Sequence, residues 1–139
     1  MPLATELYDR IIAAKLFMDE NYQEPIGLDL IAQQAFLSRF HFHRLFSRIY
    51  KKTPHQYLTI KRMDKAKNLL SENKQVSEVC SEVGFESLGS FSVLFKKEIG
   101  FAPQYYRNMA ARMKQKMKEE PRTAIPHCFI EGWGGMNGE

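Results

Sequence analysis

Residues 79–107 read VCSEVGFESLGSFSVLFKKEIGFAPQYYR, and the predicted fold rests on this stretch. Apolar residues recur in it at helical spacing, first in a short segment that ends at Gly84 and then in a longer one that ends at Gly100. Ser87 is placed to cap the second segment, because a serine side chain can satisfy a free amide of the first helical turn. Two short helices joined by a tight turn make a helix-turn-helix unit.

The same unit occurs a second time, earlier in the chain. Six residues reappear at an offset of 49: Ser38, Phe42, Leu45, Phe46, Pro54 and Tyr57 correspond to Ser87, Phe91, Leu94, Phe95, Pro103 and Tyr106. The preceding helices match at an offset of 48, with Ile31–Ala32 against Val79–Cys80, so the second turn is one residue longer. Shared caps and prolines at one offset indicate a duplicated module rather than helical periodicity alone.

The rest of the chain is also patterned for helices up to about residue 118. A first helix is predicted over about 5–21 and is interrupted by Pro25 and Gly27, and Thr53-Pro54 marks the start of a long helix to about residue 71. We therefore predict an all-α chain with a first helix-turn-helix subdomain over 5–52, a linker helix over 53–73 and a second subdomain over 74–118. Prolines and glycines after Pro121 predict a non-helical tail over 119–139.

The positive charge of the chain is concentrated in one region. The net charge is only +4, but Ser38 to Lys74 holds ten basic residues against Asp64 and Glu72. Met1 to Leu37 is acidic instead, with two basic residues against six acidic ones. A local surplus of this size favours a polyanionic partner, although a charge run is also compatible with a merely solvated helix face.

Polar side chains on the helix after Ser38 suit the recognition of double-stranded DNA. Arg39, His43, Arg44 and Ser47 share its outer side, opposite an apolar stripe of Phe42, Leu45, Phe46 and Ile49. Such side chains can hydrogen-bond base edges and phosphates, and the helix N-termini at Ser38 and Ser87 favour an anion. The alternative is a helical module that binds only protein, without specific DNA binding.

The most specific residues of the second unit are Val79, Gly84-Phe85, Ser87, Ser90-Phe91, Phe95-Lys96-Lys97, Gly100, Pro103 and Tyr106-Arg107. With these residues the chain resembles, over about 7–107, the DNA-binding domain of AraC/XylS-type transcriptional regulators. The resemblance implies seven helices, with a rigid long helix between two reading units. It also implies that one protomer contacts two successive major-groove segments. The resemblance further implies a protein that acts mainly as an activator through contact with RNA polymerase.

Positions matching the base-reading residues of that family are Arg39, Phe40, His43 and Arg44 on the first recognition helix. Phe40 is expected to meet a thymine methyl group or a sugar, with a plain core residue as the alternative. On the second recognition helix the outward positions carry no long hydrogen-bonding side chain: they are Leu88, Gly89, Ser90, Ser92 and Val93. Without an arginine or glutamine to make a bidentate contact, the second unit is expected to read DNA weakly.

A further set of residues is expected to contact phosphates: Ser38, Ser47, Arg48, Lys51, Lys52, Arg62, Ser87, Lys96, Lys97 and Arg107. Lys51 stands where the second unit has Gly100. Either the turn is relaxed at this position, or Lys51 accepts a left-handed conformation at a small cost and gains a phosphate contact.

Catalysis and metal binding are not expected. His41 and His43 lie two residues apart on a helix and point in different directions, so they cannot share a metal ion. We expect no enzyme activity and no cofactor, since no catalytic triad, carboxylate pair or glycine-rich phosphate loop is visible. Cys80 and Cys128 are expected to be free thiols, with a redox switch as the alternative.

The partners we expect are double-stranded DNA and RNA polymerase, with the chain monomeric on DNA and no membrane involved. No apolar run approaches the roughly 20 residues of a membrane span, and the first residues do not resemble a signal peptide. We therefore expect a cytoplasmic, nucleoid-associated bacterial protein. No ligand-sensing segment precedes Leu7, so either a small stand-alone regulator or a fragment of a longer one is expected.

Overall fold

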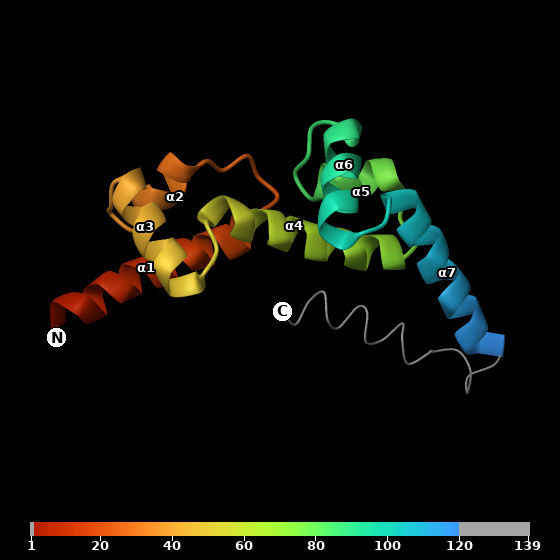
Figure 1. Cartoon of the computed structure of the whole chain (residues 1–139), viewed down its shortest axis with the longest axis horizontal. Coiled ribbons are helices and arrows are strands. Elements are labelled where there is room, and N and C mark those ends of the chain that lie inside the picture. Colours follow the sequence, from red (N-terminus) through yellow and green to blue (C-terminus); the bar gives the residue numbers. More distant parts are fainter. Residues whose placement is uncertain (1, 120–139) are drawn as a thin grey trace. The chain divides into compact units, whose positions relative to one another are not determined.

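The computed structural model describes residues 2–119, and every regular element among them is an α-helix (Figure 1). There are seven: α1 (Pro2–Asn21), α2 (Leu28–Gln34), α3 (Arg39–Tyr50), α4 (Pro54–Ser71), α5 (Val76–Glu82), α6 (Leu88–Ile99) and α7 (Pro103–Glu119). The predicted all-α class and the seven helices are confirmed. The largest difference is at α1, which begins at Pro2 rather than near Thr5, since proline is well suited to the first helical position. Glu119, predicted to begin the non-helical tail, still belongs to α7, and residues 120–139 of that tail lie outside the described residues.

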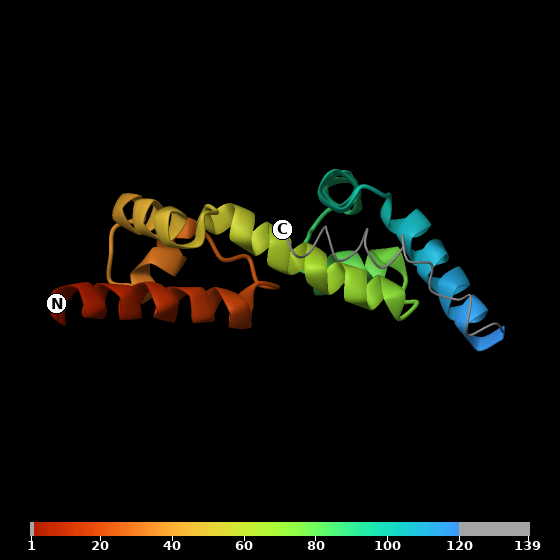
Figure 2. The same ribbon diagram turned by 60° about the horizontal axis from the view of Figure 1, so that its bottom comes forward.

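The chain divides into two compact units. Among the described residues, one unit holds those up to Asp64 together with Glu82–Gly84, and the other holds Lys65–Ser81 and those from Phe85 to Glu119. The first helix-turn-helix pair, α2 and α3, belongs to the first unit. The second recognition helix, α6, belongs to the second unit with α7 (Figure 2).

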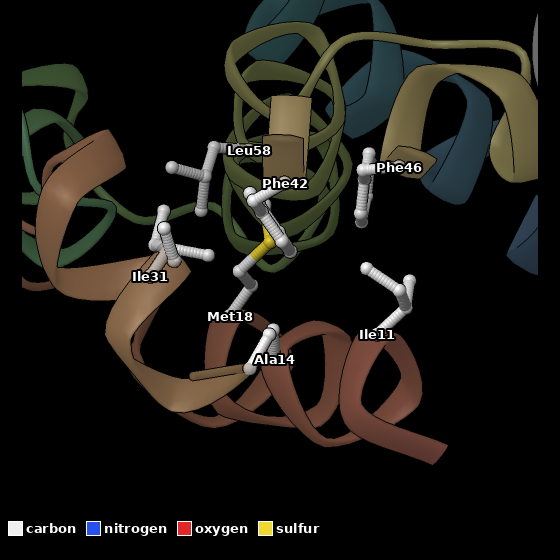
Figure 3. Packing of buried hydrophobic residues seen from close by; sticks show 9 residues of the cluster. Ile11, Ala14, Met18, Ile31, Phe42, Phe46 and Leu58 are labelled. Atoms are coloured by element: carbon white, nitrogen blue, oxygen red, sulfur yellow. The ribbon is translucent and has the colours of Figure 1, made fainter. Parts of the chain in front are cut away.

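The core of the first unit is built where α1, α2, α3 and the start of α4 meet. Figure 3 shows Met18 of α1 pointing toward Phe42 of α3, with Ile31 of α2 and Leu58 of α4 beside them. All four side chains are at most 5% exposed. Because buried apolar side chains in this core come from all four helices, the face of α3 that carries Phe42 and Phe46 is held inward.

The duplication seen in the sequence is repeated in the packing of aromatic rings. In the first unit the ring centroids of Phe42 and Phe46 are 5.5 Å apart, and those of Phe46 and Tyr57 are 5.6 Å apart with the rings at 73°. In the second unit the matching pairs, Phe91 with Phe95 and Phe95 with Tyr106, are 5.7 and 5.5 Å apart, the latter at 80°. Each recognition helix is thus fixed to the following helix by the same tilted and edge-on ring contacts.

The helix ends follow the predicted capping chemistry. Ser38 Oγ accepts a hydrogen bond from the His41 amide at 3.2 Å, and Ser87 Oγ accepts one from the Ser90 amide at the same distance. At the start of α4, the Thr53 amide donates to Gln56 Oε1 and the Gln56 amide donates to Thr53 Oγ1, which is a reciprocal capping box. The predicted capping roles of Ser38, Thr53 and Ser87 are confirmed.

Two helix ends of the first unit use non-glycine residues in the left-handed region. Lys51 ends α3 with φ 61° and ψ 20°, whereas the matching Gly100 ends α6 with φ 98°. The left-handed alternative predicted for Lys51 is therefore the observed one. Phe36, which matches Gly84, has φ 55° and leaves 82% of its surface exposed.

None of the described helices combines the length and apolar content that crossing a membrane requires. Cys80 is a free, buried thiol, as predicted for this cysteine, and its Sγ lies 3.6 Å from the carbonyl oxygen of Phe85. Burial raises the pKa of this thiol, which lowers its reactivity. Cys128 lies outside the described residues.

Candidate nucleic-acid interface

The outer face of α3 presents the four side chains predicted to contact bases. Phe42 and Phe46 are fully buried on the inner face, while Arg39, Phe40, His43 and Arg44 are all exposed. Phe40 leaves 66% of its surface exposed, so the alternative interpretation as a core residue is wrong. The four residues begin at the capped N-terminus of the helix, which is the part of a recognition helix that reaches base edges.

Arg39 has two neighbours that restrict its guanidinium group. Its Nη1 lies 3.8 Å from Asp29 Oδ2 on α2, and its Cζ lies 5.0 Å from the centroid of the Phe40 ring. Both charged side chains remain more than half exposed. An ion pair of this kind is weak in water, but it holds the arginine beside the start of α3.

The residues that follow on α3 differ in their access to solvent. Arg48 and Lys51 are exposed and Lys52 is half-buried, so these cations extend the positive surface beyond Arg44. The structure argues against the predicted phosphate contact of Ser47. Its Oγ is buried and has no hydrogen-bond partner in the described part of the chain. A serine side chain is too short to reach past its neighbours, and the predicted phosphate contact of Ser47 is not supported.

The recognition helix of the second unit presents a mostly apolar and small outer face. Leu88 and Val93 leave 48% and 72% of their surfaces exposed, Gly89 and Ser90 are exposed, and Ser92 is half-buried. Lys96 and Lys97 are exposed in the last turn of α6, where a positive charge also suits the helix dipole. The face can therefore make methyl, hydroxyl and phosphate contacts, but no bidentate hydrogen bonds to a base.

Arg62 and Arg107 are placed differently from the other residues predicted to contact phosphates. Arg62 on α4 donates from Nε to the Tyr22 carbonyl at 2.6 Å and from Nη2 to the Glu24 carbonyl at 3.0 Å. Burial lowers the pKa of Arg62, although an arginine stays charged.

Arg107 on α7 makes the same kind of contact in the second unit. Its Nε donates to the Lys74 carbonyl at 2.8 Å and its Nη2 donates to the Asn73 carbonyl at 3.0 Å. In each unit the arginine thus holds the segment after the unit's first helix. Carbonyl oxygens engage the Nε and Nη2 edge of each guanidinium, so both arginines have a structural role, and their predicted phosphate contacts stay a prediction that only Nη1 and the second Nη2 donor could fulfil.

Sequence reasoning missed the acidic partners of this surface. Asp29, which neighbours Arg39, and Asp19, which lies 3.4 Å from Lys61 Nζ, both belong to the acidic segment before Leu37, and the sequence pattern does not pair either with a basic residue. Asp29 stands in the first turn of α2, a position that favours acidic residues and was its only local signal. Within residues 2–119, no three histidine, cysteine or acidic side chains come together as metal ligands would.

Comparison with known proteins places this arrangement in a family. Residues 31–109, more than half of the chain, match the model of a helix-turn-helix domain family. The probable transcriptional regulator LumQ of Photobacterium leiognathi is 36% identical over 92 residues, which cover 66% of this chain and 37% of LumQ. The transcriptional activator AarP of Providencia stuartii is 29% identical over 122 residues, which cover 86% of this chain and 90% of AarP.

Solved structures agree with these matches. A transcriptional regulator from Chromobacterium violaceum with an AraC-type DNA-binding domain superposes with a TM-score of 0.67 at 27% identity, covering 75% of this chain and 94% of that one. The DNA-binding domain of AdpA, solved with a target DNA, superposes with a TM-score of 0.68 at 25% identity, covering 80% and 96%. This chain belongs to the AraC-type helix-turn-helix family. It spans about a third of the length of the first curated relatives that it matches.

Proposed function

We propose that this protein is a regulator of transcription that binds double-stranded DNA sequence-specifically through α3 and, more weakly, through α6. The observation that carries the proposal is the outer face of α3, where Arg39, His43 and Arg44 are exposed beside a capped helix N-terminus. Arginine can bond a guanine edge with two hydrogen bonds, and a recognition helix presents its N-terminal residues to the major groove.

We infer that only some of the cations in this region act on DNA, because others are engaged within the chain. Of the ten basic residues between Ser38 and Lys74, Arg62 is bonded to carbonyl oxygens, Lys61 lies 3.4 Å from Asp19, and Lys67 is only 6% exposed. Arg39 and Arg44 are assigned to bases, Lys65 is exposed and Lys74 is half-buried outside the predicted phosphate set, and the cations of that set that remain are Arg48, Lys51, Lys52, Lys96 and Lys97. Five phosphate contacts correspond to a slope of about −4.5 in a plot of log affinity against log salt concentration.

Unequal contributions of the two units follow from their outer faces. The first unit supplies arginine and histidine side chains, so it is the proposed base reader. The second supplies Ser90, Ser92 and apolar groups, so its contribution is phosphate anchoring by Lys96 and Lys97 together with methyl contacts and DNA shape. The names of AarP and LumQ, an activator and a probable regulator, support a role in transcription, and we propose activation through contact with RNA polymerase by a chain that is monomeric on DNA.

Selection from a pool of random duplexes tests this proposal. The purified chain is incubated with the pool at low salt, bound duplexes are sequenced, and the affinity of the enriched duplex is measured over a series of salt concentrations. We expect one enriched sequence and an affinity that falls by several decades between low and high salt. Absence of duplex binding at low salt would contradict the proposal and favour the protein-binding alternative.

A further inference from the structure

We propose that Asp29 is a positioning residue for base recognition: it holds Arg39 at a base edge and restrains it from contacting phosphates non-specifically. This inference rests on the proposed function. The geometric basis is the ion pair between Asp29 and Arg39, in which Oδ2 and Nη1 lie 3.8 Å apart. It links the first turn of α2 to the first residue of α3.

The place of Arg39 explains why a carboxylate is useful there. Arg39 is the first residue of α3, next to free amide groups that carry a partial positive charge. A cation at this end of a helix is disfavoured, and the carboxylate of Asp29 compensates for that repulsion. Without Asp29, the flexible arginine side chain would have more freedom to turn away from the helix and follow the nearest phosphate.

The remaining donors of Arg39 suit a base. Asp29 Oδ2 lies 3.8 Å from Nη1, and the ring of Phe40 lies 5.0 Å from Cζ, so the guanidinium has two neighbours while the side chain stays 53% exposed. Its Nε and Nη2 can still donate two parallel hydrogen bonds to the acceptors of a guanine. That exposure leaves Arg39 accessible to a duplex.

The duplicated module provides an independent observation. The positions of Asp29, Arg39 and Phe40 correspond in the second unit to Ser77, Leu88 and Gly89, so none of the three is retained there. The caps and core aromatic residues of the two units, by contrast, are the same. The carboxylate, the arginine and the ring thus occur together in the unit with a polar reading face and are absent together from the other.

The test compares Asp29→Asn with two control variants on defined duplexes. The probes are the duplex enriched by the wild-type chain, its single-base-pair variants and the random pool. Asp29→Glu keeps the carboxylate, and Asp9→Asn removes an exposed carboxylate from α1. Melting curves of all variants establish that they are folded.

We expect Asp29→Asn to bind the random pool more tightly, with a salt slope steeper by about 0.9, as one more phosphate contact requires. Preference at the base pair that is sensitive to Arg39→Ala should fall about fivefold, and adding Arg39→Ala to Asp29→Asn should cause no further loss of that preference. Asp29→Glu should restore the wild-type preference.

Asp29→Asn could instead change the affinity for enriched and random duplexes equally, and by as much as Asp9→Asn does. That result would show that Asp29 supplies only net charge and would overturn the inference. The inference also fails if Arg39→Ala alters no base preference, while the proposed function stands because the wild-type chain still selects a sequence. If the wild-type chain enriches no sequence, both are refuted.

Discussion

The phenol of Tyr57 donates a hydrogen bond of 2.5 Å to Asp19 Oδ1, which ties α4 to α1 inside the first unit. Asp19 also receives Lys15 Nζ at 3.1 Å and lies 3.4 Å from Lys61 Nζ. Burial raises the pKa of Tyr57 to about 12, and its bond to Asp19 adds to this effect. Burial alone would raise the pKa of Asp19, but the bonds from Tyr57 and Lys15 and the charge of Lys61 outweigh it and lower that pKa.

Replacing Tyr57 by phenylalanine should lower the free energy of unfolding by about 1–2 kcal/mol at pH 7, because the ionised Asp19 loses a charge-assisted hydrogen bond. Since the pKa of Asp19 is lowered by folding, this stabilisation is present above the ordinary pKa of about 4 and is lost as the pH falls through the lower folded value. The difference between wild type and Tyr57→Phe should therefore shrink toward pH 3. Urea denaturation at pH 7 and pH 3 measures this difference in the free energy of unfolding. Tyr8→Phe, at an exposed position of α1, is the matched control.

Arg62→Ala should destabilise the chain by about 2 kcal/mol, because the carbonyls of Tyr22 and Glu24 lose a charged donor. The salt slope of DNA binding by the folded variant should stay unchanged if the bonds of Arg62 to carbonyl oxygens are its main role. Arg48→Ala provides the contrast, with little effect on stability and a slope shallower by about 1. A shallower slope for Arg62→Ala at unchanged stability would restore the phosphate role predicted from the sequence.

Lys51→Gly should raise the melting temperature, because φ 61° costs a lysine about 1 kcal/mol that a glycine avoids. The expected rise is about 3–5 °C by differential scanning calorimetry. Gly100→Ala, at the matching position with φ 98°, should lower it. A fall in melting temperature for Lys51→Gly would show that the lysine side chain stabilises the fold by contacts that outweigh its backbone strain.

Arg44→Ala should weaken binding to the enriched duplex by about 1–3 kcal/mol and relax the preference at one base pair. Val93→Ala and Ser92→Ala should change specificity little, because neither side chain can make a bidentate hydrogen bond to a base. Fluorescence anisotropy with the enriched duplex and its single-base variants measures both effects. Greater damage from the variants on α6 would reverse the proposed ranking of the two units.

The fold could be predicted from the sequence because its signals are local. Ser38 and Ser87 cap helices within three residues of themselves, and the stripes of apolar residues repeat within each helix. The offset of 49 between the two units added a comparison inside one chain. The sequence pattern did not predict the start of α1 at Pro2 or the left-handed conformation of Phe36.

The candidate site could be predicted only in part. The outward positions of α3 follow from helical geometry, and Arg39, Phe40, His43 and Arg44 are exposed as that geometry requires. Arg62 and Arg107, predicted from their charge as phosphate contacts, are instead bonded to carbonyl oxygens 33 to 40 residues away in the sequence. Residue type alone does not distinguish an arginine that is available to bind a ligand from one that stabilises a loop by hydrogen bonds.

Periodicity, caps and duplication in the sequence were thus sufficient to determine the two helix-turn-helix units. These features act over a few residues, so no tertiary information is needed to recognise them. The tertiary structure decided which polar side chains of those units are available to a ligand: Ser47, Arg62 and Arg107 are engaged or covered, and Asp29 stands beside Arg39. Such choices depend on contacts between helices far apart in the sequence, which only the packing of the folded chain brings together.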